Sequence, residues 1–143
     1  MSKLIGSAAI ILDTEGRVLL VKHSYVKNNW DLTGGKAEEN ESAQETAKRE
    51  VFEEVGLEVV IGNLTGIYYD PDYDIHHFVF LATSTDNRTP QPSSPEIVEC
   101  GFFARNELPR PISDFTCRRI EDALRNNNDY ELFHKVGARQ WIE

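Results

Sequence analysis

Residues Gly35 to Leu57 read GKAEENESAQETAKREVFEEVGL and carry the densest pattern of fixed spacings in the chain. Three carboxylates, those of Glu50, Glu53 and Glu54, fall within five positions. They stand at set intervals from a glycine at the start of the segment and from a Gly-Leu pair at its end. At average residue usage, a random match to these positions occurs on the order of 10⁻⁹ times per starting position. The pattern therefore indicates a functional motif.

The same segment predicts a helix that begins after Ser42. Ser42 and Glu45 have the spacing of a capping box, in which each side chain accepts a hydrogen bond from the other residue's backbone N–H. At about 100° per residue, Glu50 and Glu54 fall on one stripe with two alanines, at the border of the buried face. Gly56 follows the last helical residue, where a C-cap requires positive φ.

The acidic cluster on this helix predicts a metal ion. Carboxylates four residues apart destabilise a helix by a few tenths of a kcal/mol, so a cation is needed to offset the repulsion. Mg²⁺, or alternatively Mn²⁺, takes oxygen ligands of this kind. A simple solvated face is the commoner fate of a charge run, and Glu38, Glu39 and Glu45 fit that description.

Arg49 lies at the start of the cluster. Helical periodicity turns its side chain away from Glu50 and toward Glu53. A guanidinium in this position can form a two-pronged ion pair and hold a carboxylate in place, and we predict that Glu41 is the partner.

The spacing resembles, without a mismatch, the signature box of the Nudix hydrolases, which use divalent metal to cleave nucleoside diphosphates linked to another moiety. The resemblance runs from about residue 4 to residue 125 and implies an α/β fold, namely an α/β/α sandwich with a mixed central sheet. We expect residues 1–143 to form a single domain of this type, with the box at 35–57.

The resemblance also implies roles for individual residues. It places the metal on Glu50, Glu53 and Glu54, with Glu50 a candidate for activating water and the Gly34 carbonyl a further ligand. It implies a late-loop glutamate as ligand or base, for which Glu96 fits.

Two points around these roles stay open in the sequence. Glu99 is the alternative to Glu96 as the late-loop glutamate. Thr33 stands where the family commonly has proline.

The rest of the chain alternates strand-like and turn-like segments. We predict a hairpin of 3–12 and 17–23, strands at 57–69, 76–81 and 96–103, a loop at 84–95, and a second helix at 114–124 capped by Ser113 or Asp114.

Composition limits the partners. The chain has 143 residues, 40% of them hydrophobic, and a net charge of −9, which argues against nucleic acid because phosphate backbones bind basic surfaces.

The apolar N-terminal run is too short to span a membrane and lacks a cleavage pattern. Cys100 and Cys117 form no ligand pattern, so we expect the cytoplasm. The expected partner is a small nucleotide, and a homodimer is left open.

Substrate identity is the least determined property. Four tyrosines could stack on a base, namely Tyr25, Tyr68, Tyr69 and Tyr73, although Tyr68 and Tyr69 alternate so that one of them packs in the core. We take Tyr25, Tyr69 and Tyr73 as the substrate residues. Of the neighbouring His76 and His77, only one can face a given site, so we take His77 as a pocket residue rather than the pair as metal ligands.

The aromatic segment that contains Pro71 favours a nucleotide sugar such as ADP-ribose slightly over a damaged or ordinary (d)NTP. The alternative function is a nucleotide-sensing Nudix module without turnover.

Overall fold

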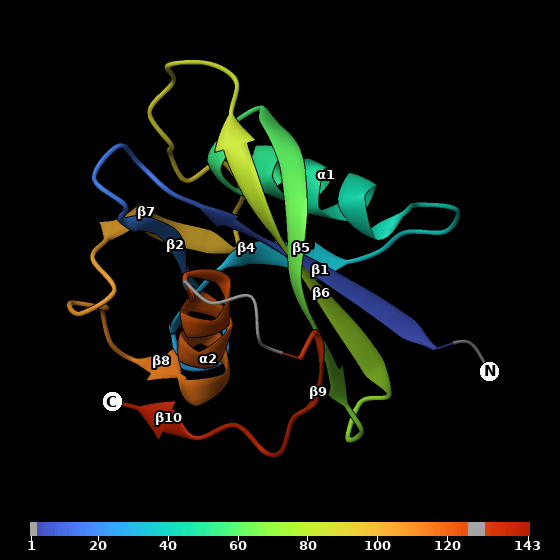
Figure 1. Cartoon of the computed structure of the whole chain (residues 1–143). Coiled ribbons are helices and arrows are strands. Elements are labelled where there is room, and N and C mark those ends of the chain that lie inside the picture. Colours follow the sequence, from blue (N-terminus) through green and yellow to red (C-terminus); the bar gives the residue numbers. More distant parts are fainter. Residues whose placement is uncertain (1–2, 126–130) are drawn as a thin grey trace.

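The structure is a computed structural model that describes residues 3–125 and 131–143, and within these ranges it contains two five-stranded sheets and two helices (Figure 1). The elements in chain order are β1 (Leu4–Ile11), β2 (Val18–His23), β3 (Trp30–Asp31), β4 (Thr33–Lys36), α1 (Ala43–Val55), β5 (Val59–Asp70), β6 (Ile75–Ser84), β7 (Ile97–Phe103), β8 (Ile112–Ser113), α2 (Asp114–Ala123), β9 (Phe133–Lys135) and β10 (Trp141–Ile142). The expected α/β class is confirmed.

Both sheets are mixed. The first has the order β4-β1-β6-β5-β9, in which β1 runs parallel to β6 and antiparallel to β4. The second has the order β10-β8-β3-β2-β7, in which β3 runs parallel to β8 and antiparallel to β2. The strands thus divide between two mixed sheets.

The predicted hairpin of 3–12 and 17–23 is wrong in its pairing. Both strands are present, but only Leu12 and Val18 pair, and β1 and β2 then enter different sheets. The reason is burial on both faces, since nearly every residue of the two strands is buried. A two-stranded ribbon would leave one such face in water.

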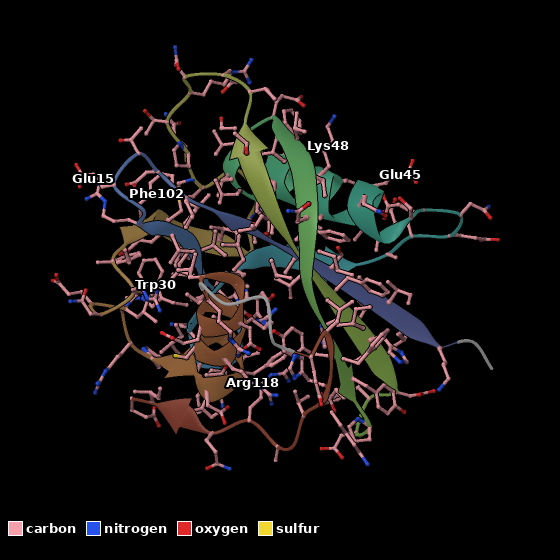
Figure 2. The ribbon with its side chains drawn as sticks, in the orientation of Figure 1. Glu15, Trp30, Glu45, Lys48, Phe102 and Arg118 are labelled. Carbon is pink, nitrogen blue, oxygen red and sulfur yellow. The ribbon has the colours of Figure 1, made fainter. Side chains whose placement is uncertain are left out.

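The helix α1 has the predicted ends. The Glu45 N–H donates to Ser42 Oγ at 3.1 Å and the Ser42 N–H donates to Glu45 Oε1 at 2.8 Å, which completes the capping box. Gly56 ends the helix at φ 78°. Glu45 and Lys48 are exposed on the side of α1 away from the sheet (Figure 2).

The two helices cover opposite faces of β1. Val51 of α1 belongs to a core cluster with Ala9, whereas Ile120 of α2 belongs to a second cluster with the next residue along the strand, Ala8. Alternate residues of a strand point to opposite faces, so β1 lies between the two cores. The N-cap of α2 is Ser113, whose side chain accepts from the Thr116 N–H.

The chain passes from one sheet to the other between β3 and β4. Asp31 ends β3 in the second sheet and Thr33 begins β4 in the first, with only Leu32 between them. Residues on the two sheets are therefore brought side by side at this crossing. Within the described ranges, no helix has the length and apolar character needed to cross a bilayer.

Candidate active site

Glu54 is the most buried of the three clustered glutamates. Its side chain lies on the inner face of α1, where the residue is 5% exposed, and Oε1 accepts a hydrogen bond from the Gly34 N–H at 2.9 Å. Burial raises the pKa of Glu54 to about 8, the Gly34 hydrogen bond acts against this, and the negative charge of Glu50 adds to it. Glu54 has no cationic partner in the part of the chain that the structure describes.

Glu50 lies directly against the backbone of Gly35. A Cβ built on Gly35 would stand 2.5 Å from the Glu50 carboxyl carbon, closer than any real contact. Burial raises the pKa of Glu50, although the adjacent Arg49 acts in the opposite direction. The glycine at the start of the box is thus required because a carboxylate occupies the space of its side chain.

Arg49 joins three of the box carboxylates. Its Nε and Nη2 donate to the two oxygens of Glu41 at 2.7 and 3.0 Å, so the predicted two-pronged pair is confirmed. Nη1 donates to Glu50 at 2.8 Å and contacts Glu53 at 3.2 Å. The expectation that Arg49 turns away from Glu50 is therefore wrong, because the planar guanidinium contacts Glu50 and Glu53 at the same time. Arg49 lowers the pKa of Glu41 to about 2.

The carboxylate oxygens of Glu50, Glu53 and Glu54 suit a hard divalent cation, although the three side chains do not converge on a common point. Among the described residues, no three acidic, His or Cys side chains enclose a common point as they stand. Glu50 and Glu53 bind Arg49, while Glu54 binds the Gly34 amide. The fit rests on Glu54, a buried carboxylate without a cationic partner in the described ranges, and on the hard oxygens of its two neighbours.

The loop at 84–95 returns to the end of α1. The N–H groups of Gln91 and Ser93 donate to the carbonyls of Val55 and Glu54 at 3.0 and 2.9 Å. This docking brings the exposed Glu96 near the acidic cluster, where its charge contributes to the raised pKa of Glu50 and of Glu54. Glu99 lies farther along β7, opposite Lys22 of β2. Of the two candidates, Glu96 is the one beside the cluster.

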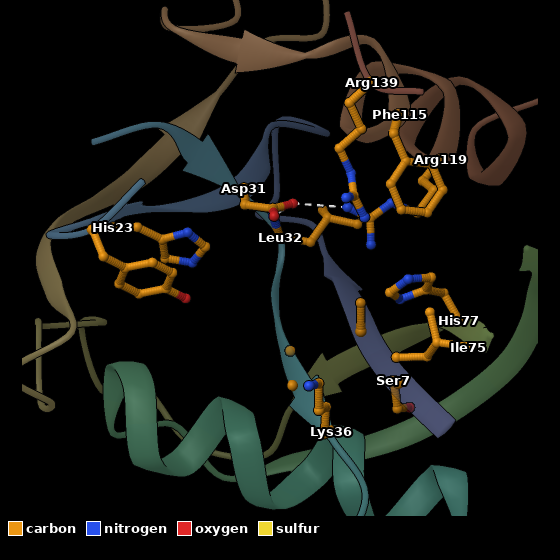
Figure 3. A pocket seen from close by; sticks show the side chains of 15 residues that line it. Ser7, His23, Asp31, Leu32, Lys36, Ile75, His77, Phe115, Arg119 and Arg139 are labelled. Carbon is orange, nitrogen blue, oxygen red and sulfur yellow. Dashed lines mark hydrogen bonds and ion pairs between the residues drawn. The ribbon is translucent and has the colours of Figure 1, made fainter. Parts of the chain in front are cut away.

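A cavity of about 180 Å³ opens between the two sheets at the β3–β4 crossing (Figure 3). Gly34, Gly35 and Lys36 line the part nearest the acidic helix. The remaining wall includes residues from β1, β2, β3, β6, α2 and the C-terminal segment, namely Ser7, His23, Tyr25, Asp31, Leu32, Ile75, His77, Phe115, Arg119 and Arg139. The acidic cluster and the cavity thus share the Gly34–Gly35 backbone.

The buried Arg119 forms an ion pair with the partly exposed Asp31 in the wall of this cavity (Figure 3). Arg119 Nη2 donates to Asp31 Oδ1 at 2.8 Å, and Thr116 Oγ1 donates to the same oxygen at 2.7 Å. The guanidinium of Arg119 stacks on the Phe115 ring, with its carbon 4.1 Å from the ring centroid. This network ties β3 to α2.

The predicted substrate residues are distributed unevenly around the cavity. His77 and Tyr25 line it, and Tyr25 stacks on the His23 ring at 4.7 Å. Tyr73 lines an adjoining cavity that shares His77 and Arg139 with the first.

The expectation that Tyr69 lines the substrate site is contradicted by its position. Its hydroxyl donates to Asp74 at 2.7 Å and its ring packs on His76, on the far face of β5. The alternation left open which tyrosine would be internal, and Tyr68 is the one in the core.

The cavity wall also contains residues that were not predicted from the sequence, namely Asp31, Arg119, Phe115 and Arg139. One signal was available, because Arg119 falls on the apolar stripe of α2 that also carries Phe115 and Ile120. An arginine on the inner face of an amphipathic helix needs a partner or a ligand. No comparable signal marked Arg139.

The two mixed sheets and the carboxylate-bearing helix α1 define an α/β domain, and comparison with known proteins identifies its family. The NUDIX domain model matches residues 3–121, so the chain belongs to the NUDIX domain family.

A putative 8-oxo-dGTP diphosphatase of Bacillus subtilis is 35% identical over 80 residues, covering 56% of this chain and 53% of that protein. The chain thus spans about half the length of that relative. An ADP-ribose pyrophosphatase of Methanocaldococcus jannaschii is 30% identical over 127 residues, covering 82% of this chain and 72% of that protein. The NUDIX hydrolase structure from Nitrosomonas europaea has the same fold, with a TM-score of 0.78 at 22% identity, covering 95% of this chain and 80% of that one.

Proposed function

We propose that the chain is a metal-dependent hydrolase that cleaves diphosphate linkages in nucleoside diphosphate derivatives by attack of water at phosphorus. The observation that carries this proposal is the placement of Glu50, Glu53 and Glu54 beside a cavity that shares the Gly34–Gly35 backbone. The names of the Bacillus and Methanocaldococcus relatives support the reaction type.

The proposed metal ligands are Glu50, Glu53, Glu54, the Gly34 carbonyl and Glu96. Mg²⁺ or Mn²⁺, when bound, neutralises the diphosphate and lowers the pKa of a bound water. Glu54 is already oriented by the Gly34 N–H. Glu53, whose side chain is half-exposed, can rotate away from Arg49 toward a ligand at low cost.

The remaining side chains prepare the attack on phosphorus. Glu50 takes the proton of the attacking water as general base, and the Gly35 backbone keeps its carboxylate in place. Arg49 is a positioning residue, because its fork holds Glu41 and Glu50 together. Glu96 reaches the substrate from the loop that docks on α1. Water adds across the P–O–P linkage, which gives two phosphorylated products and needs no covalent enzyme intermediate.

The substrate proposal covers nucleotide sugars such as ADP-ribose and (d)NTPs, including damaged ones, with a small nucleotide as the partner. We also propose that residues 1–143 act as one domain and that the reaction takes place in the cytoplasm, which the free thiols of Cys100 and Cys117 support. The net charge of −9 supports the exclusion of nucleic acid as a partner.

The test is hydrolysis by the full chain with and without Mg²⁺, using ADP-ribose, 8-oxo-dGTP and the four common dNTPs. We expect metal-dependent release of a nucleoside monophosphate from at least one substrate. The Glu39→Gln variant, which removes an exposed carboxylate outside the cluster, should keep this activity. Metal-independent nucleotide binding without turnover of any substrate would replace the proposal with the sensing module.

A further inference from the structure

The wall of the cavity is positively charged, although the chain as a whole has a net charge of −9. Three of the lining side chains are cationic, those of Lys36, Arg119 and Arg139, and one is a carboxylate, that of Asp31. The glutamates of the acidic cluster do not line the cavity. A cleft whose walls carry an excess of one charge concentrates ligands of the opposite sign. The cavity therefore favours an anionic group.

Only one of the three cations has a close carboxylate partner. Arg119 pairs with Asp31 at 2.8 Å. Lys36 is exposed and forms no ion pair within residues 3–125 and 131–143. Arg139 Nη1 lies 4.0 Å from Oδ2 of Asp70, which is beyond hydrogen-bond distance. The charges of Lys36 and Arg139 are thus left without a hydrogen-bonded counter-ion among these residues.

The Arg139 side chain is accessible as well as charged. It is 33% exposed, and its guanidinium carbon lies 5.0 Å from the centroid of the Phe115 ring (Figure 3). Among the described residues, none accepts a hydrogen bond from it, so the protein leaves its N–H donors unused. The planar guanidinium matches the oxygens of a phosphate group, to which it can donate two parallel hydrogen bonds.

The backbone on both sides of Arg139 is held by hydrogen bonds. On one side, the Val136 N–H donates to the Tyr69 carbonyl of β5 at 2.9 Å. On the other, the Gln140 carbonyl accepts from the Asp114 N–H at 2.9 Å, and the Gln140 N–H donates to Asp114 Oδ1 at 2.9 Å. The segment therefore spans from the first sheet to the start of α2, with Arg139 immediately before its second attachment.

The charge of Arg139 acts on the inside of the cavity. His77 lines the same wall, and its pKa is lowered to about 3, chiefly by burial and further by the charges of Arg119 and Arg139. The positive potential that disfavours a protonated imidazole here favours an anion in the same space.

We infer that Arg139 is a substrate-binding residue, which binds a phosphate of a nucleotide in this cavity without the help of the metal ion, and that the charge of Lys36 adds to the attraction. This inference deepens the proposed function, on which it rests for the choice of a nucleotide as the ligand. The acidic cluster repels phosphate unless a cation lies between them, whereas Arg139 attracts it directly.

The test measures binding of AMP, adenosine and inorganic phosphate to the full chain by calorimetry, with a chelator present to remove metal. We expect AMP to bind about 10-fold or more tightly than adenosine, because only AMP has a phosphate for Arg139. Inorganic phosphate should bind more weakly than AMP, since it leaves most of the cavity empty. The inference is overturned if AMP binding is undetectable or no tighter than that of adenosine, or if inorganic phosphate binds as tightly as AMP.

The Arg139→Gln variant should weaken AMP binding by about 10-fold and leave adenosine binding unchanged. Arg139→Met should do the same, and it serves if the Gln variant fails to fold, because Met keeps an unbranched apolar stem against Phe115. Lys135→Gln is the matched control, since Lys135 is an exposed cation of the same segment that does not line the cavity. Wild-type affinity for AMP in a folded Arg139→Gln or Arg139→Met variant overturns the assignment.

Turnover with Mg²⁺ separates failure of this inference from failure of the proposed function. For any nucleotide that the chain hydrolyses, Arg139→Gln should raise KM about 10-fold and leave kcat nearly unchanged, because Arg139 does not belong to the acidic cluster. AMP binding that depends on Arg139, without hydrolysis of any substrate, removes the proposed function and keeps the phosphate contact. Hydrolysis with the same KM in wild type and Arg139→Gln does the reverse.

Discussion

The carboxyl carbon of Glu50 lies 2.5 Å from the point where a Cβ on Gly35 would stand. The Gly35→Ala substitution therefore has to displace Glu50 from the backbone of β4. We expect loss of most of the hydrolytic activity, since Glu50 is the proposed base, while the sheet pairing of β4 is kept. Steady-state kinetics together with thermal unfolding would show this, and Gly137→Ala, where a Cβ meets open space, is the control. Near-normal turnover in Gly35→Ala would contradict the role of Glu50.

Glu54→Gln should abolish most activity while leaving the fold intact. The amide keeps the volume of the carboxylate but removes a metal ligand. Burial and the charge of Glu50 raise the pKa of Glu54 to about 8, so ionising this carboxyl costs free energy that the neutral amide avoids, and the stability of the metal-free chain should stay level or rise. Activity at saturating Mg²⁺ and a denaturant titration without metal would check both parts. A Gln variant with normal turnover would remove Glu54 from the ligand set.

Glu96→Gln should lower kcat more than it lowers metal affinity, and Glu99→Gln should have the smaller effect. Glu96 lies beside the acidic cluster at the end of a loop, whereas Glu99 lies opposite Lys22 in the β2–β7 ladder. The comparison requires kcat and the Mg²⁺ concentration at half-maximal activity for both variants. The opposite order would move the role to Glu99.

Thr33→Val should stabilise the protein by about 1 kcal/mol. The Thr33 hydroxyl is buried and has no hydrogen-bond partner in the described ranges. The isosteric valine therefore removes the free-energy cost of burying an unpaired hydroxyl. Thr65→Val is the matched control, because the buried Thr65 hydroxyl donates to the Val79 carbonyl at 3.1 Å. That variant should lose about as much free energy of unfolding. Destabilisation of both variants to the same extent would show that Thr33 has a partner.

His77 should make the free energy of unfolding fall as the solution is acidified. Its pKa is about 3 in the folded protein and about 6.5 in the unfolded chain, so between these values the unfolded state binds more protons. Stability contributed by the neutral ring is complete above about pH 6.5 and is lost progressively below it. From pH 7.5 to pH 5 we expect His77 to account for about 2 kcal/mol of the loss. Urea titrations of His77→Gln at both values should show a weaker pH dependence than wild type, and an equal dependence would contradict the buried neutral imidazole.

Local patterns in the sequence predicted the parts of the fold that depend on neighbours along the chain. The capping box of Ser42 and Glu45, the left-handed Gly56 and the limits of α2 all rest on interactions within a few residues, and the structure contains each of them. The ion pair of Arg49 with Glu41 spans eight positions and was also found from spacing.

The parts that were missed depend on distant packing. Asp31 and Arg119 are separated by 88 positions, and only the assembled sheets bring them together. The strands β8, β9 and β10 have two or three residues each, too few to show a period. Alternation showed that one of Tyr68 and Tyr69 is internal, but the choice between them depends on which side of β5 the helix α2 covers.

The single residue Leu32 between β3 and β4 has an evolutionary consequence. Asp31 lines the cavity and the Gly34 N–H donates to Glu54 of the acidic helix, so three backbone steps set the distance between the cavity wall and the proposed metal ligands. Substitutions in the cavity wall can change the shape of the cavity without moving the acidic cluster. An insertion at Leu32 would instead shift the cavity wall relative to the acidic cluster, and lineages that acquire new substrates should therefore vary the cavity wall while keeping the length of this crossing.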